Sequence, residues 1–235
     1  MSRTGFEEVA YRDGDTALVG LLARPTCTPR AAVAVFPTIF NTTPGVEAKA
    51  LALADAGYAA LICDFYGRAP TDMAEAFAMG GAMRGDAAAF RRRLRAGLGA
   101  LRQHTPGLPM LAIGFCMGGQ AVLELARDGA DLLAVASFHG LLDTEARADR
   151  PIVPRILVCH GDADTLVPRE QVIGFWEEMD AVGADWHFHS YAGVAHGFTN
   201  PCMLDGTENP AYDASADRQS WSAMHALFDE VLSRP

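Results

Sequence analysis

The chain lacks several features that would assign it to a class at once. No apolar run approaches the ~18 residues needed to cross a bilayer, and residues 1–8 contain no apolar segment typical of a secretory signal. No stretch rich in serine, proline and glycine divides the 235 residues, and no internal repeat is visible. We therefore expect a cytoplasmic protein that folds as a single domain over residues 1–235 and has no membrane partner.

Positive charge is also scarce. The sequence has 19 Lys and Arg against 29 Asp and Glu, which gives a formal net charge of −10. A surface of this sign repels the phosphates of nucleic acids and of anionic lipids, so neither is an expected partner. The arginines of residues 91–95 fall in a helical pattern and are expected to form a solvated helix face.

Cysteines are few, and their spacing is uninformative. The five cysteines are odd in number, scattered, and include no Cys-x-x-Cys pair. This disfavours a disulfide framework and a zinc cluster, and no metal or other cofactor is expected. Cys63 and Cys159 each end an apolar run and are expected in the core. His187 and His189 are spaced like a metal pair, but no third ligand accompanies them, so a packing or solvent-facing role is favoured.

The apolar pattern that is present predicts an α/β protein. Residues 6–22 alternate between polar and apolar types about Asp13-Gly14-Asp15, which predicts an antiparallel hairpin. Short continuous apolar runs then alternate with helical patterns, as in a mostly parallel sheet that has helices on both faces and the hairpin at its edge. The expected strands are residues 31–36, 58–63, 110–114, 133–137, 155–159 and 185–190, and the expected helices are 46–56, 86–104, 120–127 and 216–232.

The pentapeptide Gly114-Phe115-Cys116-Met117-Gly118 lies between a predicted strand and a predicted helix. The backbone must reverse there within a few residues, and a Cβ at either glycine would collide with a neighbouring strand or helix. This predicts a nucleophile elbow with cysteine at its tip. At a helix N-terminus, free N–H groups and the helix field favour a thiolate and an adjacent oxyanion. An inert cysteine in a tight turn is the alternative.

Two more loops that follow predicted strands contain an acid and a histidine. Residues 160–168 include Asp162, which is well placed to form the turn itself, and Asp164, which we favour as the acid that orients a histidine. Residues 192–198 present His196 between small residues. The order nucleophile, acid, histidine is that of α/β-hydrolases, and the carboxyl ends of parallel strands meet at one edge. Either residue alone would be a weak signal, but together they predict a catalytic triad.

These residues suit the hydrolysis of an ester or lactone. The Cys116 thiolate would attack the carbonyl carbon, and the resulting thioester would be hydrolysed by water with His196 as general base. Asp164 would hold the imidazole in the required tautomer. The expected oxyanion donors are the backbone N–H groups of Met117 and of Ile39, which lies in the loop after the first buried strand.

With these motifs, the chain resembles the dienelactone hydrolase family of α/β-hydrolases from about Ala17 to Leu232. The resemblance rests on residues 56–58, 63–68, 114–119, 161–168 and 195–198. It implies an α/β-hydrolase fold and a carboxylic ester or lactone hydrolase of the carboxymethylenebutenolidase type. It also implies a Cys-His-Asp triad without metal or organic cofactor and a small-molecule substrate. The oligomeric state is left open between monomer and homodimer.

Two positions depart from the family pattern. Thr38 stands where the best-known members have a glutamate beside the nucleophile, so activation of the thiol would rest on His196 alone. Asn200, four residues after the histidine, stands where those members use an arginine to hold a substrate carboxylate, and Arg84 is the nearest candidate for a second arginine. Because an amide does not replace bidentate recognition by arginine, a neutral or bulkier ester is an alternative substrate.

Residues of the substrate pocket are less well defined by the sequence. We expect Thr38, Phe40 and Tyr66 to contact the substrate. His139 ends a predicted strand at the same edge and either lines the pocket or makes a structural hydrogen bond. Residues 69–84 form either a cover over the site or an ordinary helix pair.

Two other functions are alternatives to ester hydrolysis. Cysteine-dependent glutaminases also place cysteine on such a turn, but there the acid closely follows the histidine, whereas Gly197 and Phe198 follow His196 here. A non-enzymatic protein that binds a ligand on a hydrolase-like scaffold, or senses oxidation through Cys116, is the remaining alternative.

Overall fold

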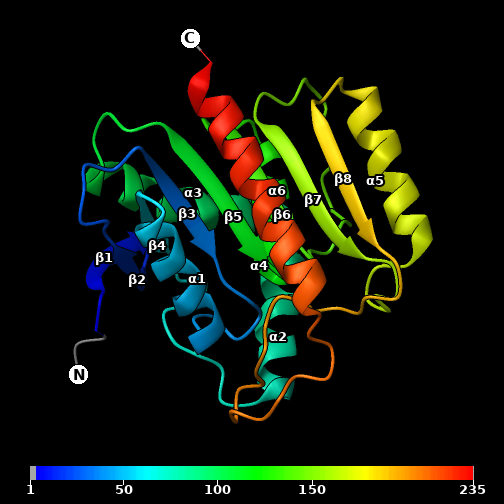
Figure 1. Cartoon of the computed structure of the whole chain (residues 1–235), viewed down its shortest axis with the longest axis horizontal. Helices are drawn as coiled ribbons and strands as arrows, with labels where there is room; N and C mark the ends of the chain where they lie inside the picture. Colours follow the sequence, from blue (N-terminus) through cyan, green and yellow to red (C-terminus); the bar gives the residue numbers. More distant parts are fainter. Residues whose placement is uncertain (1–3, 235) are drawn as a thin grey trace.

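The computed structural model describes residues 4–234 and contains an eight-stranded sheet (Figure 1). Its strands are β1 (Glu7–Asp13), β2 (Thr16–Ala23), β3 (Ala31–Phe36), β4 (Tyr58–Ile62), β5 (Met110–Phe115), β6 (Ala134–Phe138), β7 (Arg155–Gly161) and β8 (Trp186–Tyr191). They lie in the order β1-β2-β4-β3-β5-β6-β7-β8. The hairpin β1–β2 is antiparallel, as is the pair β2–β4, and all other neighbours are parallel. The predicted fold class, with the hairpin at an edge, is confirmed.

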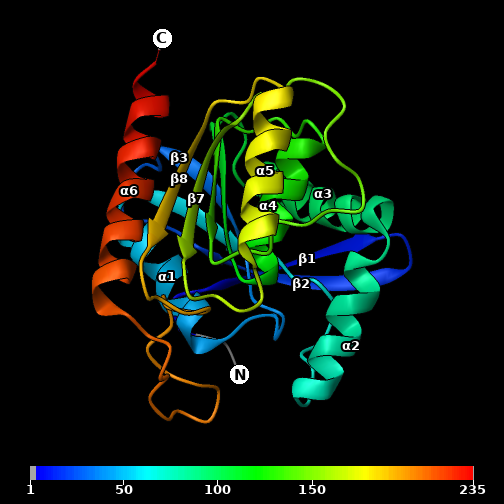
Figure 2. The same cartoon turned by 90° about the vertical axis from the view of Figure 1, so that its right-hand side faces the viewer.

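Helices cover both faces of this sheet. They are α1 (Pro44–Asp55), α2 (Met73–Arg84), α3 (Ala87–His104), α4 (Met117–Arg127), α5 (Arg169–Ala181) and α6 (Ala214–Ser233). Helices α1 and α6 pack on one face, and α3, α4 and α5 pack on the other, as the edge-on view in Figure 2 shows. Each helix is too short or too polar to span a membrane, within the part of the chain that the structure describes.

Strand β3 shows why a continuous apolar run was informative. Its alternate side chains enter different cores: Ala32 and Ala34 pack on the α3–α4 side, whereas Val33 and Val35 pack on the α1–α6 side. All six residues of the strand are buried. A strand covered on both faces has no polar side, so its sequence shows no alternation.

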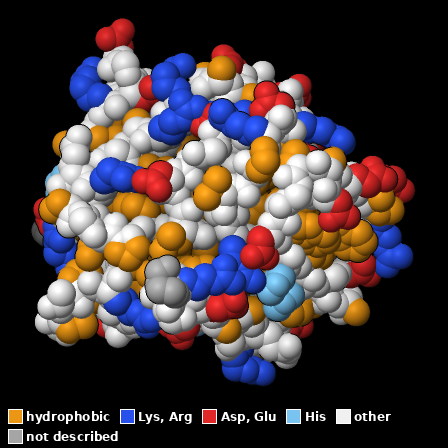
Figure 3. Space-filling view, turned by 90° about the horizontal axis from the view of Figure 1, so that it is seen from above, with side chains coloured by type: hydrophobic (Ala, Val, Ile, Leu, Met, Phe, Trp, Pro, Cys, Tyr) orange, Lys and Arg blue, Asp and Glu red, His pale blue; other side chains and the backbone are white. Residues whose placement is uncertain are grey.

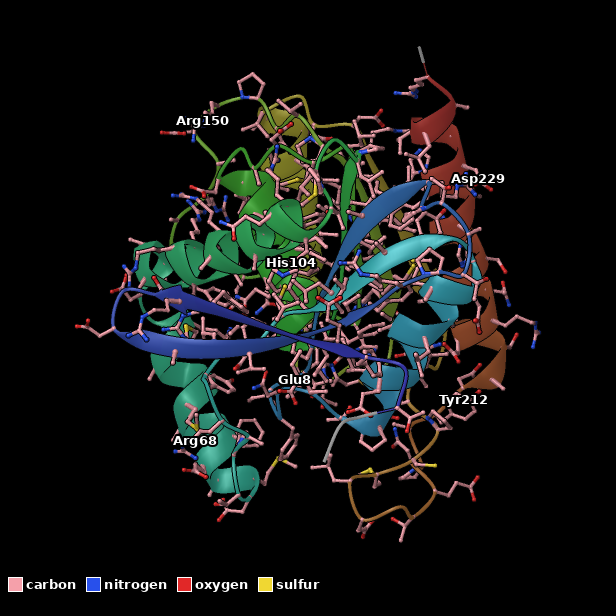
Figure 4. The ribbon with its side chains drawn as sticks, turned by 90° about the vertical axis from the view of Figure 1, so that its left-hand side faces the viewer. Glu8, Arg68, His104, Arg150, Tyr212 and Asp229 are labelled. Carbon is pink, nitrogen blue, oxygen red and sulfur yellow. The ribbon has the colours of Figure 1, made fainter. Side chains whose placement is uncertain are left out.

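The carboxyl ends of β3, β5, β6, β7 and β8 meet at one edge of the sheet, at the lower end in Figure 1. Helix α2 and the segment before α6 extend beyond this edge on two sides of it. In Figure 4 the labelled Arg68 lies beside α2, and the labelled Tyr212 lies just before α6. The Arg68 guanidinium lies 2.5 Å from the Glu75 carboxylate, which attaches the preceding loop to α2. Residues 69–84, expected to be either a cover or a helix pair, contain one helix, α2, at the margin of this edge, so the helix pair is wrong.

Candidate active site

Cys116 lies at a strained turn between β5 and α4. Its backbone has φ 55° and ψ −118°, a conformation that residues with a side chain rarely adopt. A Cβ added to Gly118 would lie 2.0 Å from the Phe36 carbonyl oxygen, and one added to Gly114 would lie 1.9 Å from the carbonyl oxygen of Gly118. Both glycines are therefore required, and the turn has the geometry of a nucleophile elbow.

The Cys116 sulfur lies against the His196 imidazole. Burial acts to raise the pKa of the thiol, but the hydrogen bond and the charge of His196 outweigh it, so the pKa of Cys116 is lower than its ordinary value. Burial likewise acts to lower the pKa of His196, yet hydrogen bonds to Asp164 and Cys116 raise that pKa to about 10. Nε2 of His196 has no nitrogen or oxygen partner among the described residues, so it is left to face the sulfur. These opposite shifts favour the charged forms of both groups, a thiolate and an imidazolium.

Two backbone N–H groups point at the same sulfur. They belong to Met117, the first residue of α4, and to Ile39, in the loop after β3. Both hydrogen bonds lower the pKa of Cys116, because they stabilise the thiolate. The structure thus brings together the two donors that were predicted for an oxyanion, beside the atom that would attack a carbonyl carbon.

The loop that carries Ile39 is held by Asn41, a residue whose role the sequence analysis missed. Asn41 has φ 64°, its Nδ2 donates to Asp64 Oδ1 at 2.7 Å, and its Oδ1 accepts from the Phe65 N–H at 3.2 Å. The buried Asp64 carboxylate also accepts from the Val19 N–H at 3.0 Å. These bonds tie the loop after β3 to the loop after β4. The available signal was Asp64 directly after a strand and an asparagine in a turn, because asparagine tolerates positive φ.

Asp164, rather than Asp162, meets the histidine. Its buried carboxylate lies 2.7 Å from His196 Nδ1 through Oδ2 and accepts from the Leu166 N–H at 2.9 Å through Oδ1. Asp162 instead pairs with Arg169 at 3.0 Å near the surface. A buried carboxylate on Nδ1 leaves Nε2 directed at the sulfur, which is the arrangement that a triad requires.

The three residues that were predicted to contact the substrate differ in what they contact in the structure. The Tyr66 hydroxyl donates to Met117 Sδ at 3.4 Å, and burial together with the charge of Cys116 raises the pKa of Tyr66, so this ring lies at the site. Thr38 Oγ1 accepts from the Phe40 N–H at 3.2 Å, which shapes the same loop. Contact of Thr38 and Phe40 with a substrate stays a prediction.

Thr38 also lines a crevice of about 30 Å³ with Lys49, His139, Thr199 and Asn200. That volume is close to the volume of one water molecule, so the crevice by itself does not hold an ester. His139 lines this crevice and also makes a structural hydrogen bond, in which its Nδ1 accepts from the Cys116 N–H at 3.1 Å.

The cations near the site are engaged with carboxylates. Arg84 ends α2, where its guanidinium contacts Gln120 Oε1 at 2.5 Å and both carboxylate oxygens of Asp143 at 3.0 Å. Lys49 lies 2.5 Å from Asp217. Arg84, the candidate for a second substrate-binding arginine, is thus paired with a carboxylate, and a contact between Arg84 and a substrate stays a prediction.

Other polar clusters lie away from this site. Among residues 4–234, no group of three or more His, Cys, Asp and Glu could hold a metal ion, and His187 and His189 are exposed on β8. A groove of about 570 Å³ lies between β8 and α6, but it is lined by neither Cys116 nor His196.

Known proteins resemble this chain over most of its length. The family model described as "Dienelactone hydrolase family" matches residues 18–232. The crystal structure of P91, a dienelactone hydrolase-like promiscuous phosphotriesterase from metagenomic libraries, is 37% identical, covers 96% of this chain and 98% of its own, and has a TM-score of 0.88. The solved structure m3DLH is 38% identical, covers 97% of this chain and 98% of its own, and has a TM-score of 0.89.

Curated sequences agree with this relationship. A probable 2-oxo-3-(5-oxofuran-2-ylidene)propanoate lactonase from Bradyrhizobium sp is 29% identical over 192 residues, which are 75% of this chain and 77% of that protein. The uncharacterized protein K02A2.1 of Caenorhabditis elegans is 37% identical over 154 residues, which are 61% of this chain and 95% of that protein. The chain belongs to the dienelactone hydrolase family of α/β-hydrolases.

Proposed function

We propose that the protein hydrolyses a small carboxylic ester or lactone, with Cys116 as nucleophile, His196 as general base and Asp164 as the orienting acid. The observation that carries this proposal is the convergence of one imidazole and two backbone N–H groups on a partly buried sulfur whose pKa is lowered. Burial without such partners has the opposite effect: it raises the pKa of the Cys63 thiol and raises that of Cys159 to about 12.

The reaction follows from these contacts. The Cys116 thiolate attacks the carbonyl carbon, a C–S bond forms, and the carbonyl electron pair moves onto oxygen. The N–H groups of Met117 and Ile39 stabilise this oxyanion, and each donor contributes ~3 kcal/mol to lowering the barrier. Collapse of the intermediate breaks the C–O bond, the His196 imidazolium protonates the departing oxygen, and a thioester remains. Water, deprotonated by His196, then attacks the thioester, and the acid leaves as the thiolate re-forms.

The charges around the site favour a substrate without a carboxylate. Thr38 and Asn200 are uncharged, and Arg84 is already bound to Asp143. A carboxylate-bearing lactone, as a carboxymethylenebutenolidase takes, would enter without an unpaired cation to receive it. We therefore propose that neutral esters and neutral lactones are better substrates, since an unpaired charge is costly to desolvate.

The test is a panel of aryl esters, neutral and carboxylate-bearing lactones, and acyl thioesters. We expect Cys116→Ala to lower kcat/KM by about a thousandfold or more, because the attacking group is lost. Intact-mass spectrometry during turnover should show an acyl group on the wild type that is absent from this variant. The matched control is Cys202→Ala, an exposed cysteine, which should leave kcat/KM unchanged. Undiminished hydrolysis by Cys116→Ala would contradict the thioester mechanism. A reactive Cys116 without turnover of any substrate would favour a thiol sensor.

A second activity is worth including because P91 is described as a promiscuous phosphotriesterase. We propose that the same sulfur attacks the phosphorus of a neutral phosphotriester, so that a P–S bond forms and the aryl oxide leaves. The expected result is slow aryl oxide release that Cys116→Ala abolishes. Release that is equal in the variant would remove this second activity and leave ester hydrolysis untouched.

A further inference from the structure

His139 contacts the backbone of the elbow from the neighbouring strand. It directly follows β6, is only 3% exposed, and has φ 41°. Its Nδ1 lies 3.1 Å from the Cys116 backbone nitrogen, and its Nε2 lies 2.9 Å from Thr199 Oγ1. The proton transfers of the proposed reaction do not use this ring, although it adjoins the nucleophile.

The partners of the ring determine its protonation state. A backbone N–H can only donate, so Nδ1 must present a lone pair to Cys116. The single proton of a neutral ring is then on Nε2, from which it is donated to the Thr199 hydroxyl oxygen. A protonated ring would place two N–H groups against each other at Cys116. The contact therefore requires His139 to be neutral and in the Nε2–H tautomer.

The surroundings of the ring keep it in that state. It packs edge-on against His196, with ring centroids 5.1 Å apart, and against Phe198, at 5.3 Å. Burial, followed by the charges of His196 and Lys49, holds the pKa of His139 well below its ordinary value. Lys49 itself is paired with the Asp217 carboxylate at 2.5 Å. The neutral His139 ring thus lies next to the charged His196 imidazole.

We propose that His139 is a positioning residue: its Nδ1 accepts the Cys116 N–H and thereby holds the strained turn in the conformation that aims the sulfur at His196. The Phe138 carbonyl oxygen shares this N–H at 3.1 Å, so the bond anchors the elbow to the end of β6. The inference rests on the proposed function. It also has a consequence for that function: the Cys116 N–H is occupied and cannot serve an oxyanion, which leaves Met117 and Ile39 as the donors.

Four variants distinguish the contribution of the His139 Nδ1 acceptor from the other properties of this residue. His139→Asn keeps an acceptor where Nδ1 lies and tolerates positive φ. His139→Gln moves the amide to the place of Nε2, which retains a partner for Thr199 but removes the acceptor for Cys116. His139→Gly relieves the backbone strain and has no acceptor. Thr199→Val leaves the acceptor in place and removes only the partner of Nε2.

The readouts are the pH midpoint of Cys116 alkylation by iodoacetamide and the separate values of kcat and KM for an aryl ester. We expect the Gln and Gly variants to raise the midpoint and to lower kcat about tenfold, with KM nearly unchanged, since a lost buried hydrogen bond has an effect of this size. His139→Asn should stay within about threefold of the wild type, and Thr199→Val should lie between. A thermal unfolding curve for each variant checks that the variant is folded.

A wild-type measurement avoids any folding defect of the variants. Nitrogen NMR of the His139 ring should show an unprotonated Nδ1 and a protonated Nε2 from about pH 6 to about pH 9. The inverse tautomer, titration in this range, a His139→Gln variant with wild-type midpoint and kcat, or a His139→Asn variant as impaired as His139→Gln would each overturn the inference. If wild-type Cys116 is inert and Cys116→Ala still hydrolyses esters, the proposed function fails instead.

Discussion

The two ends of the parallel sheet differ in how their backbone and charges are arranged. Within residues 4–234, three residues other than glycine have positive φ, namely Asn41, Cys116 and His139. They follow β3, β5 and β6 at the carboxyl end, and each contacts the site or the loop that shapes it. Strain of this kind persists only where surrounding contacts stabilise it.

The amino end of the sheet has a different character. Arg30 precedes β3 and lies 2.6 Å from Asp229, and Arg102, in the last turn of α3, lies 2.9 Å from Asp131. These side chains are about half exposed or more, and Figure 3, which views this end, shows basic and acidic side chains side by side. Exposed pairs contribute little to stability, because water screens them. The comparison predicts that substitutions at the carboxyl end have large effects and substitutions at the amino end have small ones.

The largest effect at the carboxyl end of the sheet is expected from a comparison of two neighbouring aspartates, Asp164 and Asp162. Asp164→Asn should lower kcat/KM by about a thousandfold, because the amide stabilises neither the required tautomer nor the imidazolium of His196. Asp162→Asn, which affects only the exposed pair with Arg169, should change kcat/KM less than twofold or so. Steady-state kinetics on one aryl ester measures both. Equal losses in the two variants would contradict the assignment of Asp164.

The pH dependence of thiol reactivity gives the next largest effect. The pKa of Cys116 is lowered and that of His196 is raised to about 10, so the pair is charged between these two values. Alkylation of Cys116 should therefore set in at a lower pH than alkylation of an ordinary thiol and should fall as the pH drops through the lowered pKa of the thiol. His196→Ala should move this midpoint upward, because the partly buried thiolate loses its partner.

The other cysteines provide the control in the same experiment. Peptide mapping should show Cys159 unreacted at neutral pH, because burial raises its pKa to about 12. An unchanged midpoint for Cys116 in the His196→Ala variant would show that the imidazole does not hold the thiolate.

Glycine substitutions compare the elbow with an open helix position. Gly118→Ala should destabilise the protein by about 3 kcal/mol or more, because its Cβ would lie 2.0 Å from the Phe36 carbonyl oxygen and 2.4 Å from that of Pro37. Gly99→Ala, in α3, meets nothing within 4 Å and should stabilise it by about 0.5–1 kcal/mol. Urea unfolding measures both, and a tolerated Gly118→Ala would contradict the close packing of the elbow.

The smallest effect is expected at the amino end. Asp229→Asn removes an exposed partner of Arg30 and should change the free energy of unfolding by less than about 1 kcal/mol. Its kcat/KM should equal that of the wild type. A loss of activity there would show that the two ends of the sheet are coupled.

Much of the fold and of the candidate site was predictable because its signals are contiguous. Apolar runs such as residues 31–36 predicted buried parallel strands, and the spacing of Gly114 and Gly118 about Cys116 predicted the elbow. These signals depend on local periodicity and local sterics, which a few neighbouring residues specify. Residues 69–84 were left undecided between a cover and a helix pair, because the helix that forms there, α2, buries only Ala76 and Gly80 and so shows little apolar pattern.

Long-range contacts were decided only by the tertiary structure. The sequence favoured Asp164 over Asp162, but the contact itself depends on the packing of their loop, which brings the Asp164 carboxylate to His196 and leaves Asp162 with Arg169. The hydrogen bond from the Cys116 N–H to His139 Nδ1 joins two residues that are 23 apart in sequence. It depends on the pairing of β5 with β6. The sequence alone determined which elements form and which residue types are available. The register of the strands and the rotamers of buried polar groups decided their partners, because hydrogen bonds require atoms within about 3 Å, which no sequence spacing specifies.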